Sequence, residues 1–570
     1  MGLFSELRRR NVLRMAILYL VAAWLIMQVT EVLMSLVGLP PWSGRAVIAI
    51  LVIGFPITLV FSWFFELTTD GISLEKDVEP SRSITHDTGR RIDFIVISLL
   101  FAAVILFAYD KWWVSSAPER SIAVLPFINL SDDPEQEYFS DGLAEDILNL
   151  LANVPELRVI SRSSSFSFKE QGLDVPTIAA KLNVAHVLEG SVRKSGNQLR
   201  VTAQLIEVES DSHLWSNTYD HEMKEVFAVQ DEIATAVVNA LKATLTGKTP
   251  QAKKTNPDAY ALYLQARHLI EQRNVQNFDL AEAMLEDALA LDPGYEPAWA
   301  ELAYFYLHPA NSSNLSFHER VERARHAITQ ALAINPEYEA ALVAMANIEM
   351  NYEWNFTAAN DYLDRALRKN PNDARALVYA ARSNRVFGRV DEAVKLARRA
   401  VDLDPVSPTN HYALGIYLHI SNHIQEGINQ LRTALALSPT MSLVRFDLGM
   451  MLLARGDAEA ALEMIEQEPS EGFRLTGRAI VQHALADATA SEAALQELLA
   501  NHQEWFAYQI ASVYAYRNEA DEAFFWLDRC YEIHDALSEM LVDPLLMNLH
   551  DDPRWEPFLD KMGLPYKGSM

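Results

Sequence analysis

Prolines recur at a nearly constant spacing in the second half of the chain, and this repeat strongly constrains what the sequence can fold into. They stand at positions 257, 293, 336, 371, 405 and 439, so that successive separations are 36, 43, 35, 34 and 34 residues. A period near 34 residues is typical of stacked pairs of antiparallel helices, in which no pair buries its apolar face without its neighbours. The separation of 43 indicates an insertion, which we place around the segment HPANSSNLSFHER.

Small residues recur at the same places in successive units. In the unit that begins at Ala374, the pattern residues are Leu377, Ala380, Ala381, Gly388, Ala393, Ala397, Ala400 and Pro405. Small side chains let the two helices of a unit approach closely, and this pattern with this period is that of the tetratricopeptide repeat. We expect tetratricopeptide repeats over residues 256–468, and degenerate repeats with a C-terminal cap over residues 470–570. Cys530 falls at a small-residue position, which predicts a packed side chain and not a nucleophile.

Residues 118–246 have a different pattern, in which short apolar runs alternate with helical periodicity. We expect strands at 121–130, at 157–162 and three times within 185–220, and helices at 142–154, 175–184 and 226–245. This order predicts a mixed sheet with helices packed on it.

The α/β region resembles a known bacterial module. The segments IAVLPFINLSDDPEQEYFSDGLAEDILNLL, LRVISRSSSFSFK, AHVLEGSVRKSGNQLRVTAQLIE and HLWSNTYD are similar to the TolB-like amino-terminal module, which precedes tetratricopeptide repeats in many bacterial proteins. FELTTDG and SITHDTGRRIDF resemble the variant with an N-terminal membrane-spanning region. The final DPRWEPFLDKMGLP is similar to the terminal segment of TolB-like repeat proteins, which implies a cap on the solenoid.

Residues 1–115 contain three long apolar runs. Because about 20 apolar residues cross a bilayer as a helix, we expect transmembrane helices at about 12–37, 46–65 and 92–113. The predicted fold class is therefore multidomain, with three transmembrane helices, an α/β mixed-sheet TolB-like domain and an all-α tetratricopeptide solenoid.

Lysine and arginine residues around these runs predict their orientation. Arginines precede the first run and follow the second, so the N-terminus is expected in the cytosol. Three spans then place residues 115–570 in the periplasm of a bacterium, with the protein in the inner membrane. If the third run were not a span, the same residues would be cytosolic.

Charge and cysteine content exclude some classes of function. The formal net charge of −28 argues against a phosphate-binding surface, so no nucleic-acid partner is expected. A single cysteine excludes an intramolecular disulfide and a cysteine-based zinc site.

The stretch from Asn129 to Asp146 is rich in carboxylates, but it does not fit a calcium loop, because Phe139 and Leu148 would occupy ligand positions. We interpret Asp141, Glu145 and Asp146 as acids at the start of a helix, where the helix dipole favours them. A catalytic carboxylate pair assembled in three dimensions stays open at this point.

Two other clusters are weak candidates for chemistry. Ser163, Ser164 and Ser165 follow a strand without a nucleophile elbow, which favours a polar loop. His419 and His423 have the spacing to share a helix face, but no third metal ligand stands nearby in the sequence. We therefore predict no catalytic residue, no metal and no cofactor.

The first helices of successive repeats line the concave face of such a solenoid. Counting along them, we predict a partner-binding groove lined by Tyr304, Asn347, Arg375, Arg382, Arg385, Tyr412 and His419. The three arginines form a basic patch in an acidic protein, which favours an acidic or carboxylate-bearing partner.

The function that follows is a non-enzymatic, membrane-anchored scaffold whose groove binds a protein or peptide in the cell envelope. One alternative is a transmembrane sensor that acts through a separate cytosolic partner. Another is an enzyme in the α/β domain.

Overall fold

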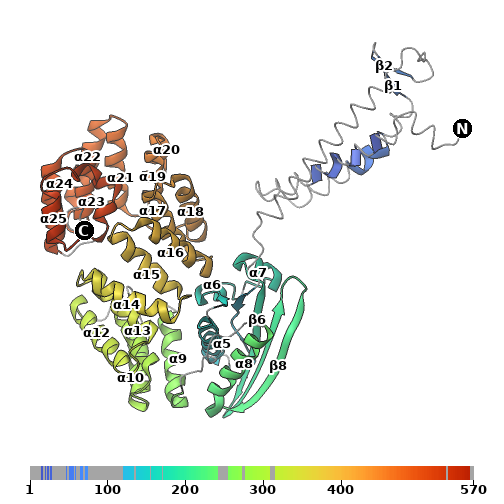
Figure 1. The fold of residues 1–570 in the computed structure, drawn as a ribbon. Coiled ribbons are helices and arrows are strands. Elements are labelled where there is room, and N and C mark those ends of the chain that lie inside the picture. The colour runs from blue at the N-terminus through green and yellow to red at the C-terminus, as the bar shows by residue number, and fades with distance from the viewer. Residues whose placement is uncertain are drawn as a thin grey trace. The chain divides into compact units, whose positions relative to one another are not determined.

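The structure is a computed structural model of the 570-residue chain. It describes parts of residues 15–27 and 47–58, residues 65–68 and 71–74, and residues 120–564 without 134–135, 155, 170, 242–253, 272–276, 309–314 and 534–536. The chain divides into two compact units, residues 1–116 and residues 117–570 (Figure 1).

The first unit contains helical segments and a small hairpin. Tyr19 joins the two helical segments, because its hydroxyl donates to the Leu51 carbonyl over 2.8 Å and its ring lies 5.5 Å from that of Phe55. Strands β1 (Phe65–Thr68) and β2 (Gly71–Leu74) pair antiparallel, with Thr68 opposite Gly71.

The prediction of three transmembrane helices, and with it the inner-membrane and periplasmic localisation, is corrected by the structure. Among the residues described, no helix combines the length and the apolar character that a membrane span requires. The third predicted span, 92–113, and many positions of the other two lie outside the described residues. Hydropathy reports the composition of a segment, whereas a span also needs one uninterrupted helix of about 20 residues.

The second unit begins with a mixed sheet, as the sequence predicted. Its strand order is β5-β3-β6-β7-β8, and β4 pairs with β6. The bounds are β3 (Ser121–Val124), β4 (Ile128–Asn129), β5 (Arg158–Val159), β6 (His186–Ser195), β7 (Gln198–Glu207) and β8 (Ser212–Glu222). Strand β3 runs parallel to both β5 and β6, whereas β6, β7 and β8 form an antiparallel meander.

Helices cover both faces of this sheet. On one face α5 (Glu137–Ala152) and α8 (Val226–Ala240) pack against alternate strand residues such as Ile122, Val124 and Val201. On the other face α7 (Val175–Leu182) packs against Ala123 and Val187.

The segment with the three serines is a helix and not the polar loop that we expected. Helix α6 (Arg162–Phe166) begins after Ser161, whose hydroxyl accepts from the Ser164 amide, and both Ser164 and Ser165 are buried.

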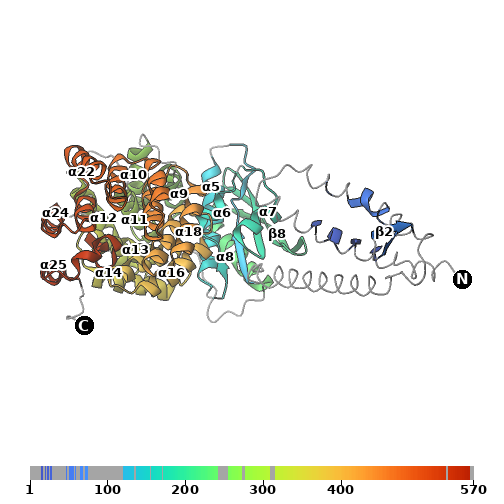
Figure 2. The ribbon, with the colours of Figure 1, turned by 90° about the horizontal axis from the view of Figure 1, so that it is seen from above.

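The rest of the unit is a solenoid of antiparallel helix pairs (Figures 1 and 2). The pairs are α9 (Pro257–Glu271) with α10 (Phe278–Leu291), α11 (Glu296–Leu307) with α12 (Phe317–Ile334), α13 (Glu339–Asn351) with α14 (Phe356–Lys369), α15 (Ala374–Val386) with α16 (Val390–Leu403), α17 (Pro408–Ile420) with α18 (Ile424–Leu437), α19 (Val444–Ala454) with α20 (Ala458–Glu466), α21 (Glu471–Ala484) with α22 (Ala488–His502), and α23 (Ala507–Tyr516) with α24 (Ala520–Ile533).

Small residues at the helix crossings explain the close packing of each pair. A Cβ atom added to Gly427 of α18 would lie 2.9 Å from the Gly415 carbonyl oxygen of α17, so the crossing leaves no room for a side chain there. Ala381, Ala393 and Cys530, at small-residue positions of the pattern, are fully buried.

The C-terminal segment packs against the middle of the solenoid as well as against its last pair. It consists of η5 (Leu537–Val542), η6 (Pro544–Leu549) and α25 (Trp555–Lys561). Met540 and Leu546 share a core with α23 and α24, but also with Met350 of α13 and Ala380 of α15. The segment thus ties the last repeat to units that are distant in the sequence.

The mixed sheet and the solenoid share a hydrophobic core. Tyr260 and Leu264 of α9 are buried together with Phe139 and Leu143 of α5, and Figures 1 and 2 show α9 beside α5. The α/β region is therefore built into the same compact unit as the repeats.

Candidate functional site: the inner face of the solenoid and its contact with the sheet

The first helices of successive pairs lie side by side, α9 against α11, α11 against α13, and α13 against α15. Tyr304 on α11 is exposed, and the guanidinium of Arg375 on α15 lies 5.0 Å from the centre of its ring. Because α13 lies between these two helices, the side chains meet over the inner face of α13. The structure thus joins two of the predicted groove residues in one cation–π pair.

The two other predicted arginines differ in exposure. Arg382 is partly exposed, but Arg385 is 5% exposed and its guanidinium lies 5.7 Å from the ring centre of Tyr417. Arg385 is therefore held within the helix packing, and the basic character of the inner face rests on Arg375 and Arg382.

The remaining three predicted groove residues are partly buried. The Tyr412 hydroxyl donates to Asp447 Oδ2 over 2.7 Å, which ties α17 to α19. His419 lies in the last turn of α17, one residue before its end, and burial lowers the pKa of its imidazole. Asn347 accepts a hydrogen bond from Asn351 on the same helix.

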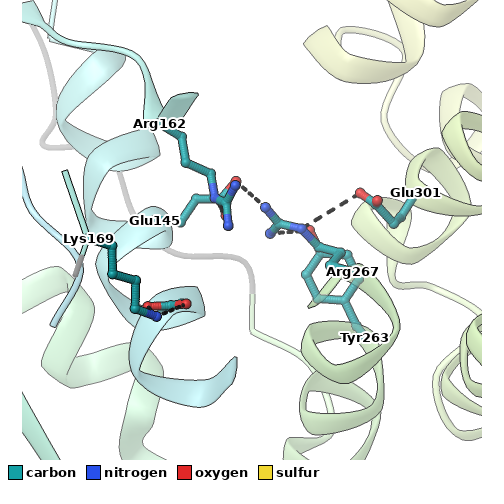
Figure 3. A network of polar contacts seen from close by, with 7 residues as sticks. Glu145, Arg162, Lys169, Tyr263, Arg267 and Glu301 are labelled. Carbon is teal, nitrogen blue, oxygen red and sulfur yellow. Dashed lines mark hydrogen bonds and ion pairs between the residues drawn. The ribbon is translucent and has the colours of Figure 1, made fainter. Parts of the chain in front are cut away.

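A network of ion pairs, which the sequence reasoning missed, lies where α5 meets α9 (Figure 3). Glu145 on α5 pairs with Arg267 on α9 and, over 2.6 Å, with Arg162 on α6. Arg267 also lies 3.7 Å from Glu301 on α11, and its guanidinium donates to the Tyr263 hydroxyl over 2.9 Å. Burial by itself would raise the pKa of Glu145, but the positive charges of Arg267 and Arg162 outweigh it and hold the pKa below its usual range.

A second carboxylate of α5 pairs with a lysine. Lys169 Nζ donates to Asp141 over 2.7 and 2.9 Å and lies 2.6 Å from Glu137 Oε1. Burial raises the pKa of Asp141 in spite of the lysine.

The third carboxylate, Asp146, is held by neutral groups. Its Oδ2 accepts from Gln230 over 2.9 Å and from the Tyr260 hydroxyl over 2.5 Å. Burial raises the pKa of Asp146 to about 6, although the hydrogen bond from Tyr260 opposes the shift.

These contacts correct our interpretation of the acidic stretch. Helix α5 begins at Glu137, so Asp141, Glu145 and Asp146 lie beyond its first turn, where the helix dipole has little effect. Their partners come from segments up to 122 residues away in the chain, as in the pair of Glu145 with Arg267. No local sequence pattern predicts such partners.

The sheet also contacts the solenoid at a second, distant place. Ser163 Oγ donates to Asp404 Oδ2 over 2.6 Å, Ser164 Oγ donates to Asp404 Oδ1, and the Ser161 amide donates to the Leu403 carbonyl over 2.7 Å. The guanidinium of Arg158 donates to the Asp402 carbonyl over 3.1 Å. The α/β region therefore contacts the solenoid at two places, at α9 and at the end of α16.

The described part of the chain contains no candidate metal site. Across residues 120–564, apart from the gaps named above, and the described parts of the first unit, no group of three or more histidine, cysteine or acidic side chains could hold a metal ion. The acids of α5 are neutralised by basic or hydrogen-bonding neighbours instead.

Two family models match parts of the chain. A tetratricopeptide repeat model matches residues 355–408, which correspond to α14, α15 and α16. A model described as HilA/YgeH-like transcriptional regulator, second domain, matches residues 118–236, which correspond to the α/β region.

Two curated proteins are similar over about a third of the chain. A putative adenylate cyclase 3 of Rhizobium meliloti is 43% identical over 191 residues, which are 33% of this chain and 32% of that protein. The human antiviral innate immune response effector IFIT1 is 22% identical over 220 residues, which are 34% of this chain and 44% of that protein. The chain thus spans less than half the length of either relative.

Among solved structures, PilW, a type IV pilus biogenesis factor, is 17% identical and covers 45% of this chain and 99% of its own, with a TM-score of 0.30. Pseudomonas aeruginosa pilF is 16% identical and covers 38% of this chain and 96% of its own, with a TM-score of 0.31. The prediction of tetratricopeptide repeats is confirmed by the family model, and the chain carries a repeat of the type that serves as a protein-interaction scaffold.

Proposed function

We propose that this protein is a non-enzymatic scaffold that binds a protein or peptide on the inner face of its solenoid. The observation that carries this proposal is the pair of Tyr304 and Arg375 over α13, where an exposed aromatic ring and a guanidinium from different repeats face the same surface. Tyrosine and arginine are the side chains that most often dominate binding energy at interfaces.

The partner that suits this surface carries carboxylates. Arg375 lies against Tyr304 on this surface, and Arg382, two helical turns further along α15, is partly exposed, whereas the chain as a whole carries a net charge of −28. An acidic peptide would be attracted to these two arginines and repelled by most of the remaining surface, which favours one binding register.

We propose further that residues 118–246 form a TolB-like module that braces the repeats. The support is its double contact with the solenoid, through Glu145 and Arg267 at one end and through Ser163 and Asp404 at the other. A brace of this kind limits changes in the curvature of the solenoid, and so preorganises the inner face for a partner.

The alternative function is catalysis in the α/β region. It is considered because the Rhizobium relative is named a putative adenylate cyclase. The proposal predicts that the purified chain does not turn over ATP. ATP turnover that disappears in Asp141→Asn, while this variant keeps the thermal midpoint of the wild type, would show that the protein is an enzyme and not only a scaffold.

A photocrosslinking amino acid at Tyr304 tests the scaffold directly. We expect crosslinks to a specific protein in native cells from position 304, and none of them from Thr329, which is exposed on α12 in the same repeat. Arg375→Glu should remove the crosslinks from position 304, whereas Lys395→Glu on the outer helix α16 should leave them. Equal crosslinking from positions 304 and 329 would contradict a binding site on the inner face.

A further inference from the structure

The α/β region contains a cavity that the solenoid does not contribute to. Its volume is about 490 Å³, and it lies beyond the carboxyl end of β3, between the following loop, the start of α5, the end of α6 and α7. Leu125, Phe127, Phe168 and Ile178 supply much of the apolar lining. A volume of this size and a mainly apolar lining are typical of sites for small organic molecules.

The cavity lies where the order of the strands reverses, at the carboxyl end of β3. Strand β3 is followed through α5 by its neighbour β5, and the chain then returns past β3 to form β6 on the other side. The two connections cover opposite faces of the sheet, because α5 packs on one face and α7 on the other. Open α/β sheets bind ligands outside the carboxyl ends of the strands at such a reversal.

One residue in the wall of the cavity carries a buried polar atom. The side chain of Ser165 is 0% exposed, lines the cavity, and has no hydrogen-bond partner for Oγ among the residues that the structure describes. A buried hydroxyl without a partner is unfavourable, so a ligand that forms a hydrogen bond with it gains affinity.

The charges at the cavity indicate the chemical class of the ligand. Glu137 and Lys169 both line it and lie 2.6 Å apart, and Lys169 also pairs with Asp141, which is not part of the lining. The lining therefore carries one carboxylate and one ammonium, which pair with each other, and this balance of charge favours a neutral ligand.

We propose that this cavity binds a small organic molecule with an aromatic or aliphatic body and a neutral hydrogen-bonding group, which contacts the Ser165 hydroxyl. The apolar body takes up the space between Phe127, Phe168 and Ile178. The polar group lies on the side of Ser165 and Glu137.

The test uses the full chain and N-phenyl-1-naphthylamine, a neutral aromatic amine that fluoresces in apolar surroundings. We expect saturable binding to the wild type and a loss of at least tenfold in affinity in Ile178→Trp, which fills the cavity. Ala180→Trp, on the exposed side of the same helix, should bind as the wild type does. Equal binding by the wild type and Ile178→Trp, or no saturable binding at all, would overturn the proposal.

A second measurement does not depend on filling the cavity. The wild type should bind N-phenyl-1-naphthylamine about three- to tenfold more tightly than 1-phenylnaphthalene, which lacks the amine, because one hydrogen bond is worth that much. Ser165→Ala should abolish this preference. A preference that survives in Ser165→Ala, or tighter binding of the anionic 8-anilinonaphthalene-1-sulfonate, would contradict the assignment of the polar group.

Discussion

The Ser163 hydroxyl donates to Asp404 Oδ2 over 2.6 Å, although 241 residues separate the two in the chain. Asp404 is 7% exposed and also accepts from Ser164, which is fully buried. This contact and the ion pair of Glu145 with Arg267 hold the sheet to two distant parts of the solenoid, and both can be tested by substitution.

Asp404→Ala removes the acceptor of two hydroxyls. We expect it to lower the free energy of unfolding by about 1–3 kcal/mol, because a buried hydroxyl loses its partner. Hydrogen exchange should also increase in residues 158–166. Lys395→Ala, which breaks an exposed pair on α16, the helix that Asp404 follows, is the control and should change little. Unchanged exchange in residues 158–166 would show that Asp404 does not hold the sheet.

Glu145→Gln leaves two arginines, Arg162 and Arg267, close to a neutral side chain. Removing one member of a largely buried ion pair costs about 3–5 kcal/mol, so we expect a clearly lower thermal midpoint. Asp132→Asn, an exposed acid in the same stretch, should have a thermal midpoint near that of the wild type. Similar midpoints for both variants would contradict the structural role of the network.

Asp146 predicts a specific pH dependence. Its pKa is raised to about 6 in the folded chain, so the folded state binds the proton more tightly than the unfolded state does. The stabilising effect is fully present below about pH 4 and is lost as the pH rises through about 6, and it amounts to roughly 3 kcal/mol.

Asp146→Asn should abolish that dependence, because the amide oxygen still accepts a hydrogen bond but does not titrate. Urea unfolding midpoints of the wild type and this variant at pH 4, 5, 6 and 7 provide the measurement. The variant should gain stability relative to the wild type as the pH rises. A constant difference between the two proteins would show that the carboxyl does not titrate in this range.

Gly427→Ala tests the helix crossing in the fifth pair of the solenoid. The added methyl group would lie 2.9 Å from the Gly415 carbonyl oxygen, so the helices must separate, at a cost of about 1–3 kcal/mol. Thr433→Ala, exposed on the same helix α18, serves as the control. A thermal midpoint of Gly427→Ala equal to that of the control would mean that the crossing has room to relax.

Local patterns in the sequence predicted much of the architecture. The 34-residue period predicted the helix pairs, and alternating polarity predicted the meander of β6, β7 and β8. Both patterns can be read from the sequence because each helix and strand places its apolar residues at a regular spacing along the chain. The start of α5 was predicted five residues too late, at Gly142 and not at Glu137. That error led to the wrong account of Asp141, Glu145 and Asp146.

The sequence by itself determined the repeating helix pairs, the mixed sheet and the small residues at the helix crossings, since these follow from periodicity and side-chain size. The tertiary structure decided which charges meet. Arg267 approaches Glu145, Asp404 approaches Ser163, and Arg375 crosses α13 to Tyr304 only because the chain brings distant segments together. It also decided that the apolar runs near the N-terminus form no spanning helix within the residues described there. The mean hydropathy of a segment depends only on its amino-acid composition. The pairing of charged side chains and the length of a helix depend on how the whole chain folds.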